Sequence, residues 1–494
     1  MKEQLDHAER CVDAMLAARD DRWYPAFHIA ARAGWLNDPN GLCYFKGRYH
    51  VYFQHNPFDT TWGPMYWGHA SSEDMVTWRR EPIALAPSIE ADQHGVFSGS
   101  AVVSDDGLLY VYYTGHRWHD EDEWSRGATQ VQCLATSADG VNFDVHGVII
   151  DCPEGITEFR DPKVWRTGDT WFMVVAARSL AGVGQIWLYT SADMVRWAFD
   201  RVLFEDPDPR AGMLECPDLF PLGDRWVLIY SAMSLPADGY RTRNGHNSGY
   251  VVGTWAPGED FVPLTGFSPM DWGHQFYAPQ TFEAPDGRRV VYGWMSALSV
   301  PPATQQADGW CGQLTVPREL FLDADHRLGS RPIAELAGLR TETIDFGAFE
   351  LGVNEDKVLL ADAEAAEIEL VVDLAATTSD RVGLSVHKDP DGHATFVCYD
   401  DLADRVSIDR RLAAHGDRGY RSAPHPGGDK LTLRVLVDRG SVEVFAADGL
   451  AALSSYSFPG EGPRAVELSS ESGTIKVDSL TVHRLGTIWA DPDR

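Results

Sequence analysis

The chain has 494 residues, with 42 Lys and Arg against 73 Asp and Glu and a formal net charge of −31. This length exceeds what one hydrophobic core usually supports, so we expect two domains. The acidic balance repels nucleic acid and anionic membranes, which excludes them as expected partners and mildly favours a neutral substrate. The 17 Trp, 17 Tyr and 21 Phe supply aromatic rings for core packing or for stacking against sugars.

The seven cysteines are odd in number and contain no Cys-x-x-Cys pair, so neither a disulfide framework nor a zinc knuckle is indicated. They are typical of reduced thiols. The first ten residues lack the apolar segment of an export signal, and no later stretch is long and apolar enough to span a bilayer. We therefore expect a cytoplasmic protein.

The N-terminal 22 residues predict a short packing helix. Within residues 3–19, apolar side chains recur at helical spacing and charged ones lie outside the stripe. The stripe consists of Leu5, Ala8, Val12, Met15 and Leu16.

A pattern of strand, tight turn and strand then returns five times, about 60 residues apart. Each copy opens with a Pro or a Gly: Pro39, Gly99, Pro162, Pro217 and Pro279. A second marker, a Ser or Thr followed by an acid and then a large aromatic residue, occurs at 71–78, 136–143 and 190–197. Unrelated hairpins would also give strand, turn and strand, but two markers in step favour a five-bladed β-propeller over residues 23–330.

Residues 331–345 carry neither marker, so we expect a linker there. Beyond it, residues 346–494 keep the alternation of apolar and polar residues without the propeller spacing, for example at 431–437 and 442–445. Short strands separated by turn residues are typical of a β-sandwich. The predicted fold class is therefore all-β, a propeller followed by a sandwich.

Three acids stand at matching places in the repeat. Asp38 directly precedes Pro39, Asp161 directly precedes Pro162, and Glu215 lies two residues before Pro217. Taken singly, each could be an Asx-turn residue. In a propeller, however, the strand nearest the axis opens each blade, so these acids should meet around one central pocket.

Crowded carboxylates repel one another and are desolvated, which raises at least one pKa and can hold a proton near neutral pH. Glycoside hydrolysis needs such a pair, one ionised and one protonated. A hard cation such as Ca²⁺ also favours clustered acids, but the Asp-x-Asp-x-Asp-Gly spacing of a calcium loop is missing. We expect neither a metal nor an organic cofactor.

Six motifs in order resemble those of the β-fructofuranosidases, glycoside hydrolase family 32. They are Trp-Leu-Asn-Asp-Pro-Asn-Gly at 35–41, Phe-Gln-His-Asn-Pro at 53–57, Phe-Ser-Gly-Ser at 97–100, Phe-Arg-Asp-Pro at 159–162, Glu-Cys-Pro-Asp at 215–218 and Trp-Cys-Gly-Gln-Leu-Thr-Val-Pro-Arg-Glu at 310–319. The resemblance implies a five-bladed propeller joined to a C-terminal sandwich that hydrolyses β-D-fructofuranosides with retention. Residues 438–449 also resemble a structural signature of the family's sandwich.

The resemblance also implies roles for the acids. Asp38 is expected as the nucleophile, Glu215 as the general acid and base, and Asp161 as the residue that binds fructose hydroxyls and stabilises the transition state. Six further residues match positions that line the fructose pocket in relatives: Asn37, Gln54, Trp62, Phe97, Ser98 and Arg160. Each has a structural alternative, such as satisfying backbone groups, core packing or, for Arg160, neutralising Asp161.

We expect an enzyme that releases fructose from sucrose and short fructo-oligosaccharides. Within the family the alternative is a sucrose 6-phosphate hydrolase, which needs a cationic pocket for the phosphate. Two further alternatives are a non-catalytic sugar-binding protein on the same fold and an inverting arabinan-cleaving enzyme on a similar propeller. An extra face of the sandwich offers a surface through which a homo-oligomer can form.

Overall fold

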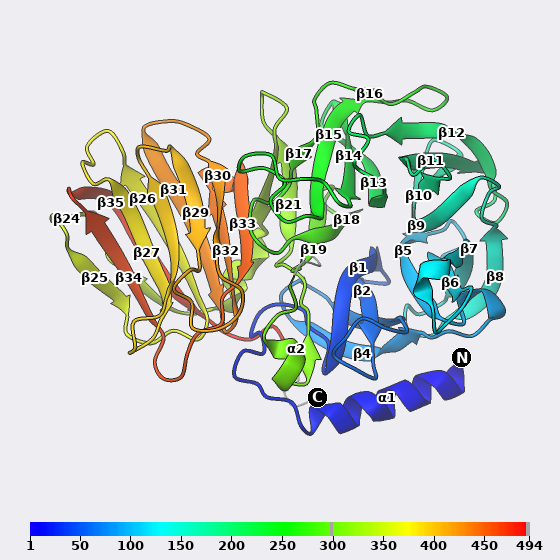
Figure 1. The fold of residues 1–494 in the computed structure, drawn as a ribbon, viewed down its shortest axis with the longest axis horizontal. Helices are drawn as coiled ribbons and strands as arrows, with labels where there is room; N and C mark the ends of the chain where they lie inside the picture. Colours follow the sequence, from blue (N-terminus) through cyan, green and yellow to red (C-terminus); the bar gives the residue numbers. More distant parts are fainter. Residues whose placement is uncertain (297–299, 491–494) are drawn as a thin grey trace.

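The computed structural model describes residues 1–296 and 300–490, and it is nearly all β (Figure 1). The described part has one long helix, α1 (Lys2–Leu16), and one single-turn helix, α2 (Thr304–Ala307). The all-β prediction is confirmed. Helix α1 buries Ala8 and Val12 against Tyr66 and Ile83, as the apolar stripe predicted.

Five sheets, antiparallel except where β20 (Trp310–Cys311) joins the first, follow one another along the chain. The first contains β1 (Gly34–Phe45), β2 (Arg48–Asn56), β3 (Tyr66–Ser72) and β4 (Trp78–Leu85). The second contains β5 (Gly95–Val103), β6 (Leu109–Trp118), β7 (Ala128–Ser137) and β8 (Asp144–Ile150). The third contains β9 (Ile156–Thr167), β10 (Thr170–Ser179), β11 (Gly184–Ser191) and β12 (Ala198–Glu205).

The fourth and fifth sheets continue the series. The fourth contains β13 (Leu214–Leu222), β14 (Arg225–Ala232), β15 (Asn247–Thr254), β16 (Val262–Pro263) and β17 (Ser268–Pro269). The fifth contains β18 (Tyr277–Glu283), β19 (Arg289–Trp294), β21 (Arg318–Leu322) and β22 (Leu328–Pro332). Strand β20 (Trp310–Cys311) pairs in parallel with β1 and so joins the first sheet.

The opening strands of these sheets form a ring. Each of β1, β5, β9 and β13 contacts the next opening strand, and β18 contacts β1. The second sequence marker forms the turn between the third and fourth strands of the first three sheets. In each turn an aspartate, Asp74, Asp139 or Asp193, accepts hydrogen bonds from backbone N–H groups two and three residues on. The marker therefore repeats because the same Asx-type turn repeats.

Two larger sheets stack beside the ring (Figure 1). One contains β23 (Arg340–Asp345), β24 (Phe349–Leu351), β26 (Ala366–Asp373), β31 (Lys430–Asp438), β32 (Ser441–Ala446), β33 (Ala451–Tyr456) and β35 (Ile475–Leu485). The other contains β25 (Asp356–Leu360), β27 (Arg381–Lys388), β28 (Thr395–Asp400), β29 (Arg405–Asp409), β30 (Tyr420–Pro424) and β34 (Ala465–Glu471). Their facing apolar side chains form one core that includes Leu370, Val435, Leu384 and Val397.

The expected linker over residues 331–345 is wrong in extent. Residues 340–345 form β23, which pairs with β35 at the edge of the seven-stranded sheet. The β-branched residues Thr341, Thr343 and Ile344 suit an edge strand, although the segment lacks an apolar alternation that would mark it in the sequence. The connection is instead the short 3₁₀ segment Ala334–Leu339.

A fully buried ionic cluster joins the ring to the stacked sheets. His28 lies 2.7 Å from Asp438 and 2.8 Å from Glu443, and Glu443 also pairs with Arg318 of the fifth sheet. Asp438 in addition accepts the backbone N–H groups of Ala26 and Phe27. Because every charge in the cluster has a partner, burial is tolerated and the two parts are tied together.

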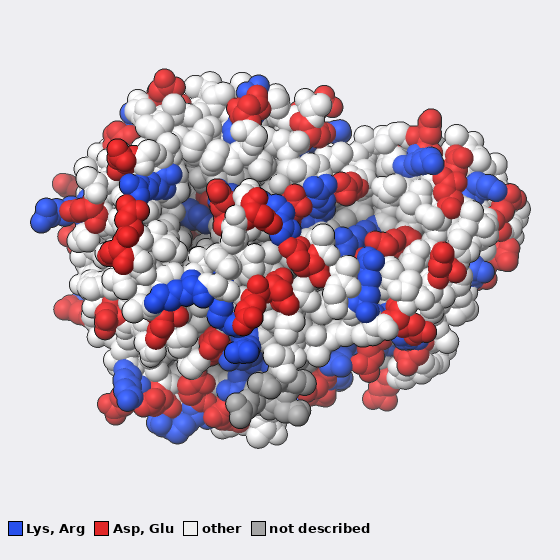
Figure 2. Space-filling model, turned by 180° about the vertical axis from the view of Figure 1, so that it is seen from behind, with Lys and Arg blue, Asp and Glu red and all other residues white. Residues whose placement is uncertain are grey.

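The chain's last described residues return to the first sheet. Trp78 and Ile488 are linked by a backbone hydrogen bond of 2.7 Å, and the N–H of Ile488 donates to Ala26 at 3.0 Å. On the face shown in Figure 2, acidic and basic side chains of the described residues are intermixed, and no extended basic patch gathers there. No helix within residues 1–296 and 300–490 has the length and apolar character needed to cross a bilayer.

Candidate active site

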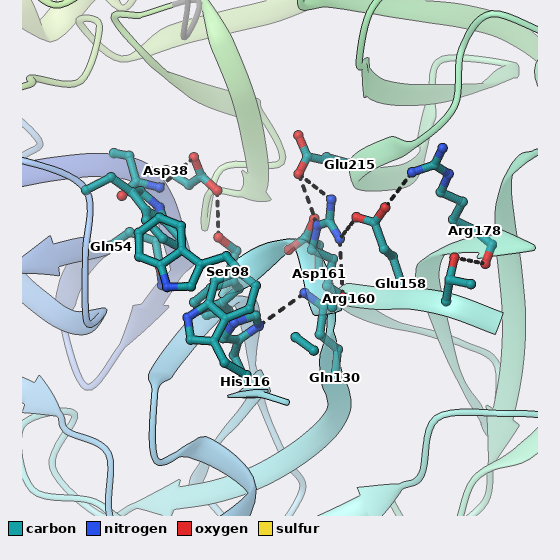
Figure 3. Close-up of a pocket in the computed structure, with 18 of the residues that line it drawn as sticks. Asp38, Gln54, Ser98, His116, Gln130, Glu158, Arg160, Asp161, Arg178 and Glu215 are labelled. Atoms are coloured by element: carbon teal, nitrogen blue, oxygen red, sulfur yellow. Dashed lines mark hydrogen bonds and ion pairs between the residues drawn. The ribbon is translucent and has the colours of Figure 1, made fainter. Parts of the chain in front are cut away.

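A cavity of about 670 Å³ opens at the centre of the ring, lined by residues of all five opening strands. The cavity contains every site residue predicted from the sequence. These are Asn37, Asp38, Gln54, Trp62, Phe97, Ser98, Arg160, Asp161 and Glu215. The expectation that the three acids meet around one central pocket thus agrees with their positions (Figure 3).

Each opening strand is irregular at the point where it meets the cavity. Its pairing register shifts between residues 36 and 39 in β1, 97 and 99 in β5, 160 and 163 in β9, 215 and 218 in β13, and 277 and 280 in β18. Asp161, Cys216 and Ala278 lie inside three of these bulges with φ of 65°, 50° and 48°. A bulge re-aims side chains, and a non-glycine residue at positive φ costs free energy, so both features are typical of functional sites.

Asp38 is oriented by hydrogen bonds to both of its carboxylate oxygens. The hydroxyl of Ser98 donates to Oδ2 at 2.6 Å, and the side-chain amide of Asn37 donates to Oδ1 at 3.1 Å. Asn37 is itself held by the indole N–H of Trp35 at 2.8 Å. These donors favour the ionised carboxylate and fix its direction, as a nucleophile needs.

Glu215 lies at the start of β13 with both carboxylate oxygens bonded. Nε and Nη2 of Arg160 donate to Oε1 at 3.0 and 2.8 Å, and the phenol of Tyr277 donates to Oε2 at 2.6 Å. Glu215 is partly accessible from the cavity. It can therefore exchange a proton with a bound molecule while its orientation is held by two neighbouring strands.

Cys216 links the other two acids. Its backbone N–H donates to Oδ2 of Asp161 at 2.9 Å, and its thiol lies 3.7 Å from Oδ2 of Asp38. Burial raises the pKa of this thiol well above its usual value, and the neighbouring carboxylates act in the same direction. The thiol therefore stays protonated and is not a nucleophile.

Crowding raises the pKa of two of the acids. Desolvation raises the pKa of Asp38 to about 6; the hydrogen bond from Ser98 opposes the shift and the charge of Glu215 adds to it. Desolvation also raises the pKa of Asp161 to about 7, against the attraction of Arg160 and with the repulsion of Glu215 and Asp38. The three carboxylates are thus close enough to act on one another electrostatically.

The remaining predicted pocket residues contribute to the walls. The side-chain amide of Gln54 donates to the backbone carbonyl of Val96 at 2.9 Å. Gln54 therefore satisfies a backbone group, which was its structural alternative, and it also lines the cavity. Phe97 stacks on His116 with ring centroids 4.0 Å apart. Trp62 packs edge-on against Phe97 at 5.8 Å.

The sequence reasoning did not find several residues that line the cavity. Tyr277 lies two residues before Pro279, the same offset as Glu215 before Pro217, so the repeat carried a signal for it. For the others, which lie at the start of β9, on later strands of the sheets or in loops, we see no comparable signal. They include His116, Trp118, Trp124, Gln130, Glu158, Arg178 and Trp294.

An aromatic wall stands on one side of the cavity mouth. The rings of Trp118 and Trp124 stack with their centroids 5.2 Å apart and their planes 6° from parallel, and Trp62 meets Trp124 edge-on at 5.6 Å. Trp124 remains 53% exposed. Exposed indole faces beside acidic groups suit contact with the apolar faces of sugar rings.

The chain belongs to glycoside hydrolase family 32. The model of the glycosyl hydrolases family 32 N-terminal domain matches residues 28–332, and that of the family 32 C-terminal region matches residues 335–484. Together these matches cover most of the chain, so the resemblance of the six motifs is confirmed.

Relatives extend over nearly the full length. A sucrose-6-phosphate hydrolase of Escherichia coli is 42% identical, over 98% of this chain and 99% of its own, and a raffinose invertase of Escherichia coli is 40% identical over 99% of both. The solved GH32 β-fructofuranosidase of Bombyx mori superposes with a TM-score of 0.87, is 32% identical and covers 99% of both chains. A mutant of that enzyme has been solved in complex with sucrose. The protein is therefore a glycoside hydrolase of a family whose members act on sucrose and related molecules.

Proposed function

We propose that the protein cleaves terminal β-fructofuranosyl bonds by double displacement, with retention of configuration. The observation that carries the proposal is the convergence of Asp38, Asp161 and Glu215 on one cavity, with Asp38 and Glu215 each held by two side-chain donors. One oriented carboxylate and one that can exchange a proton are the two groups that a retaining glycosidase needs.

In the first step, an Asp38 oxygen attacks the anomeric carbon of fructose while Glu215 donates a proton to the glycosidic oxygen, whose bond to that carbon breaks. In the second, Glu215 takes a proton from a water molecule, which attacks the same carbon and displaces Asp38. Asp161 binds fructose hydroxyls and stabilises the positive charge that develops on the ring. Cys216 supports this role, because its backbone N–H donates to Asp161 while its thiol contacts Asp38. The carboxylate of Asp161 is thereby kept beside that of Asp38.

The six other predicted residues form the fructose pocket in this proposal. Ser98 and Asn37 orient the nucleophile, and Arg160 orients Glu215. Gln54, Trp62 and Phe97 shape the wall around the ring. The five sheets of the ring are, on this proposal, the blades of a five-bladed propeller over residues 23–330, and the stacked sheets a β-sandwich that follows it.

Sucrose and sucrose 6-phosphate are the two candidate substrates, and different observations favour each. The names of the relatives favour sucrose 6-phosphate, which was the alternative in the sequence analysis. By the comparisons alone, it is the better supported of the two substrates. The charges of the cavity favour unphosphorylated sucrose. Among the described residues that line it, the cations are Arg160 and Arg178, and both are already paired with Glu158.

All seven cysteines are free thiols, which supports the proposed cytoplasmic location. Short fructo-oligosaccharides are further proposed substrates, and the open mouth of the cavity with its aromatic wall supports them.

The test is product analysis of the purified protein on sucrose, sucrose 6-phosphate, inulin-type oligomers and levan. We expect release of fructose, first as the β anomer seen by NMR. Release of the α anomer would contradict retention, and absence of hydrolysis together with sugar binding would indicate a non-catalytic sugar-binding protein. The ratio of kcat/KM for the two disaccharides decides between them.

A further inference from the structure

The guanidinium of Arg160 is shared between two carboxylates. Its Nε and Nη2 donate to Oε1 of Glu215 at 3.0 and 2.8 Å, and its Nη1 donates to Oε2 of Glu158 at 2.5 Å. Nη1 also reaches the side-chain oxygen of Gln130 at 3.2 Å. The cation beside the proposed acid and base is therefore partly neutralised by a second acid that lies outside the three carboxylates of the reaction.

The geometry of strand β9 brings Glu158 next to Arg160. It precedes Arg160 by two residues on β9, so the two side chains extend from the same face of the strand. Glu158 also lies directly opposite Arg178 in the pairing of β9 with β10, and Nη1 of Arg178 donates to its Oε1 at 2.9 Å. Each oxygen of Glu158 thus has an arginine of its own, and the four side chains form a row from Arg178 to Glu215 (Figure 3).

Charge is strongly coupled along this row. Burial disfavours the ionised form of Glu158, but the attraction of Arg160 and the hydrogen bond from Arg178 hold its pKa below the usual value. Burial likewise lowers the pKa of Arg160, but Glu215 and Glu158 outweigh it and raise that pKa. Because these side chains are at least partly buried, removing one charge changes the field at the others.

We propose that Glu158, held by Arg178, is a positioning residue that sets how strongly Arg160 acts on the proton of Glu215. This inference rests on the proposed role of Glu215 as acid and base. Glu158 touches neither the three reacting carboxylates nor, in this proposal, the scissile bond. Its effect is transmitted through the guanidinium that it shares.

Other groups face Glu215 from the neighbouring strands and stay unchanged in the test. They are Asp161 on β9, Cys216 on β13, Asp38 on β1 and Tyr277 on β18. The ring of His246 packs against that of Tyr277, with centroids 6.1 Å apart. Differences between variants of Glu158 and Arg178 therefore report on the row alone.

The first variant is Glu158→Gln, which keeps the shape of the side chain and removes its charge. Arg160 is then neutralised less, so its attraction for the ionised form of Glu215 grows. The alkaline limb of the kcat/KM profile, along which the enzyme loses the proton that it must donate, should move to lower pH by about 0.5 unit or more. We expect kcat to fall more than KM rises, because the change acts on proton transfer.

The second variant is Arg178→Gln, for which the sign is opposite. Without Arg178, the whole charge of Glu158 opposes Arg160, so the attraction of Arg160 for the ionised form of Glu215 weakens and the alkaline limb should move up. The double variant removes one charge of each sign, and its limb should lie between those of the single variants. The side chain of Arg178 is 42% exposed, so this variant carries the test even if Glu158→Gln does not fold.

A matched control is Asp400→Asn in the stacked sheets. Asp400 is also directly opposite an arginine across two strands, Arg381, with an ion pair of 3.1 Å, but it is far from the cavity in the fold. Its pH profile should equal that of the unaltered protein. If the Glu158 and Arg178 variants only lower the thermal unfolding temperature and leave the alkaline limb in place, or move it in the same direction, the proposal is overturned.

Different results would contradict the proposed function and the proposed role of Glu158. If the unaltered protein releases no fructose from any of the tested sugars, the proposed function fails and the inference fails with it. If the unaltered protein releases fructose with a normal pH profile while the limbs of the variants do not separate, only the role of Glu158 is wrong.

Discussion

Tyr277 donates its phenol hydroxyl to Oε2 of Glu215 at 2.6 Å from the opening strand of the neighbouring sheet. Burial, reinforced by the charge of Glu215, raises the pKa of this phenol well above its usual value, so the hydroxyl always carries a proton to donate. The contact fixes one oxygen of the proposed acid and base while Arg160 fixes the other.

Tyr277→Phe should lower kcat/KM about 10- to 100-fold, the loss typical of one hydrogen bond to a charged group. The matched control is Tyr292→Phe in the same sheet, because the buried hydroxyl of Tyr292 has no hydrogen-bond partner among the described residues. Steady-state kinetics of both variants are measured on whichever of sucrose and sucrose 6-phosphate the unaltered protein hydrolyses faster. Equal losses in the two variants would show that the Tyr277 hydroxyl has no special role.

Asp38→Ala and Glu215→Ala should each lower kcat by at least about 10³-fold, because a retaining mechanism needs both groups in every turnover. The fold should persist, since both side chains point into the cavity rather than into a core. Circular dichroism and thermal unfolding check the fold beside the rate measurement. A folded variant with turnover close to that of the unaltered protein refutes the assigned mechanism.

The acidic limb of the kcat/KM profile should lie near pH 6, where the raised pKa of Asp38 places the loss of its ionised form. Ser98→Ala removes a donor that lowers this pKa, so the limb should move to higher pH. Ser88→Ala is the control, because that buried hydroxyl has no partner in the described part of the chain. A limb that stays in place in Ser98→Ala would indicate that Asp38 does not limit activity at low pH.

His28 should stabilise the protein most at low pH. Burial opposes its charged form, but the hydrogen bonds that its ring donates to Asp438 and Glu443 outweigh burial and raise its pKa from 6.5 to about 9. Because the folded-state pKa lies above the unfolded value, the contribution is complete below about pH 6.5 and is lost as pH rises through about 9.

His28→Asn leaves two buried carboxylates without their shared cation and should cost about 3–5 kcal/mol in the free energy of unfolding at pH 6. The loss should be smaller at pH 9.5. Urea unfolding at the two pH values measures it, with His7→Asn on the exposed side of α1 as the control. A penalty that does not depend on pH would mean that His28 is neutral in the folded state.

Trp124→Ala should raise KM for fructo-oligosaccharides about 3- to 10-fold and leave KM for the disaccharide nearly unchanged, because one exposed ring contributes about 0.5–1.5 kcal/mol of stacking. Phe199→Ala, which removes a similarly exposed aromatic ring (50%) outside the cavity, is the control. An equal rise for short and long substrates would place Trp124 against the disaccharide itself.

The repeat in the sequence was enough to predict that Asp38, Asp161 and Glu215 share one cavity, because each acid stands one or two residues before the proline that opens its copy of the repeat. The two-residue offset of Glu215 also points to Tyr277, which the sequence analysis did not single out. The family signature at 438–449 was expected to be structural, and Asp438 and Glu443 do hold the buried cluster.

Other parts of the site could not be derived from the sequence. The pairing of Glu158 with Arg178 depends on the register of two strands, and a shift of one residue would turn both side chains to the other face. Asp161 and Cys216 have positive φ inside the bulges of β9 and β13, a conformation that non-glycine residues rarely adopt and that residue preference therefore does not predict. The stacking of Trp118 on Trp124 depends on the conformation of the loop between β6 and β7.

The first sheet takes β20 and the backbone of Ile488 as partners, so residues from opposite ends of the chain complete it. During translation, the growing polypeptide therefore exposes an unfinished sheet edge until Ile488 has left the ribosome. An exposed edge favours pairing with other chains, so a ribosome stalled before residue 488 should leave an aggregation-prone product.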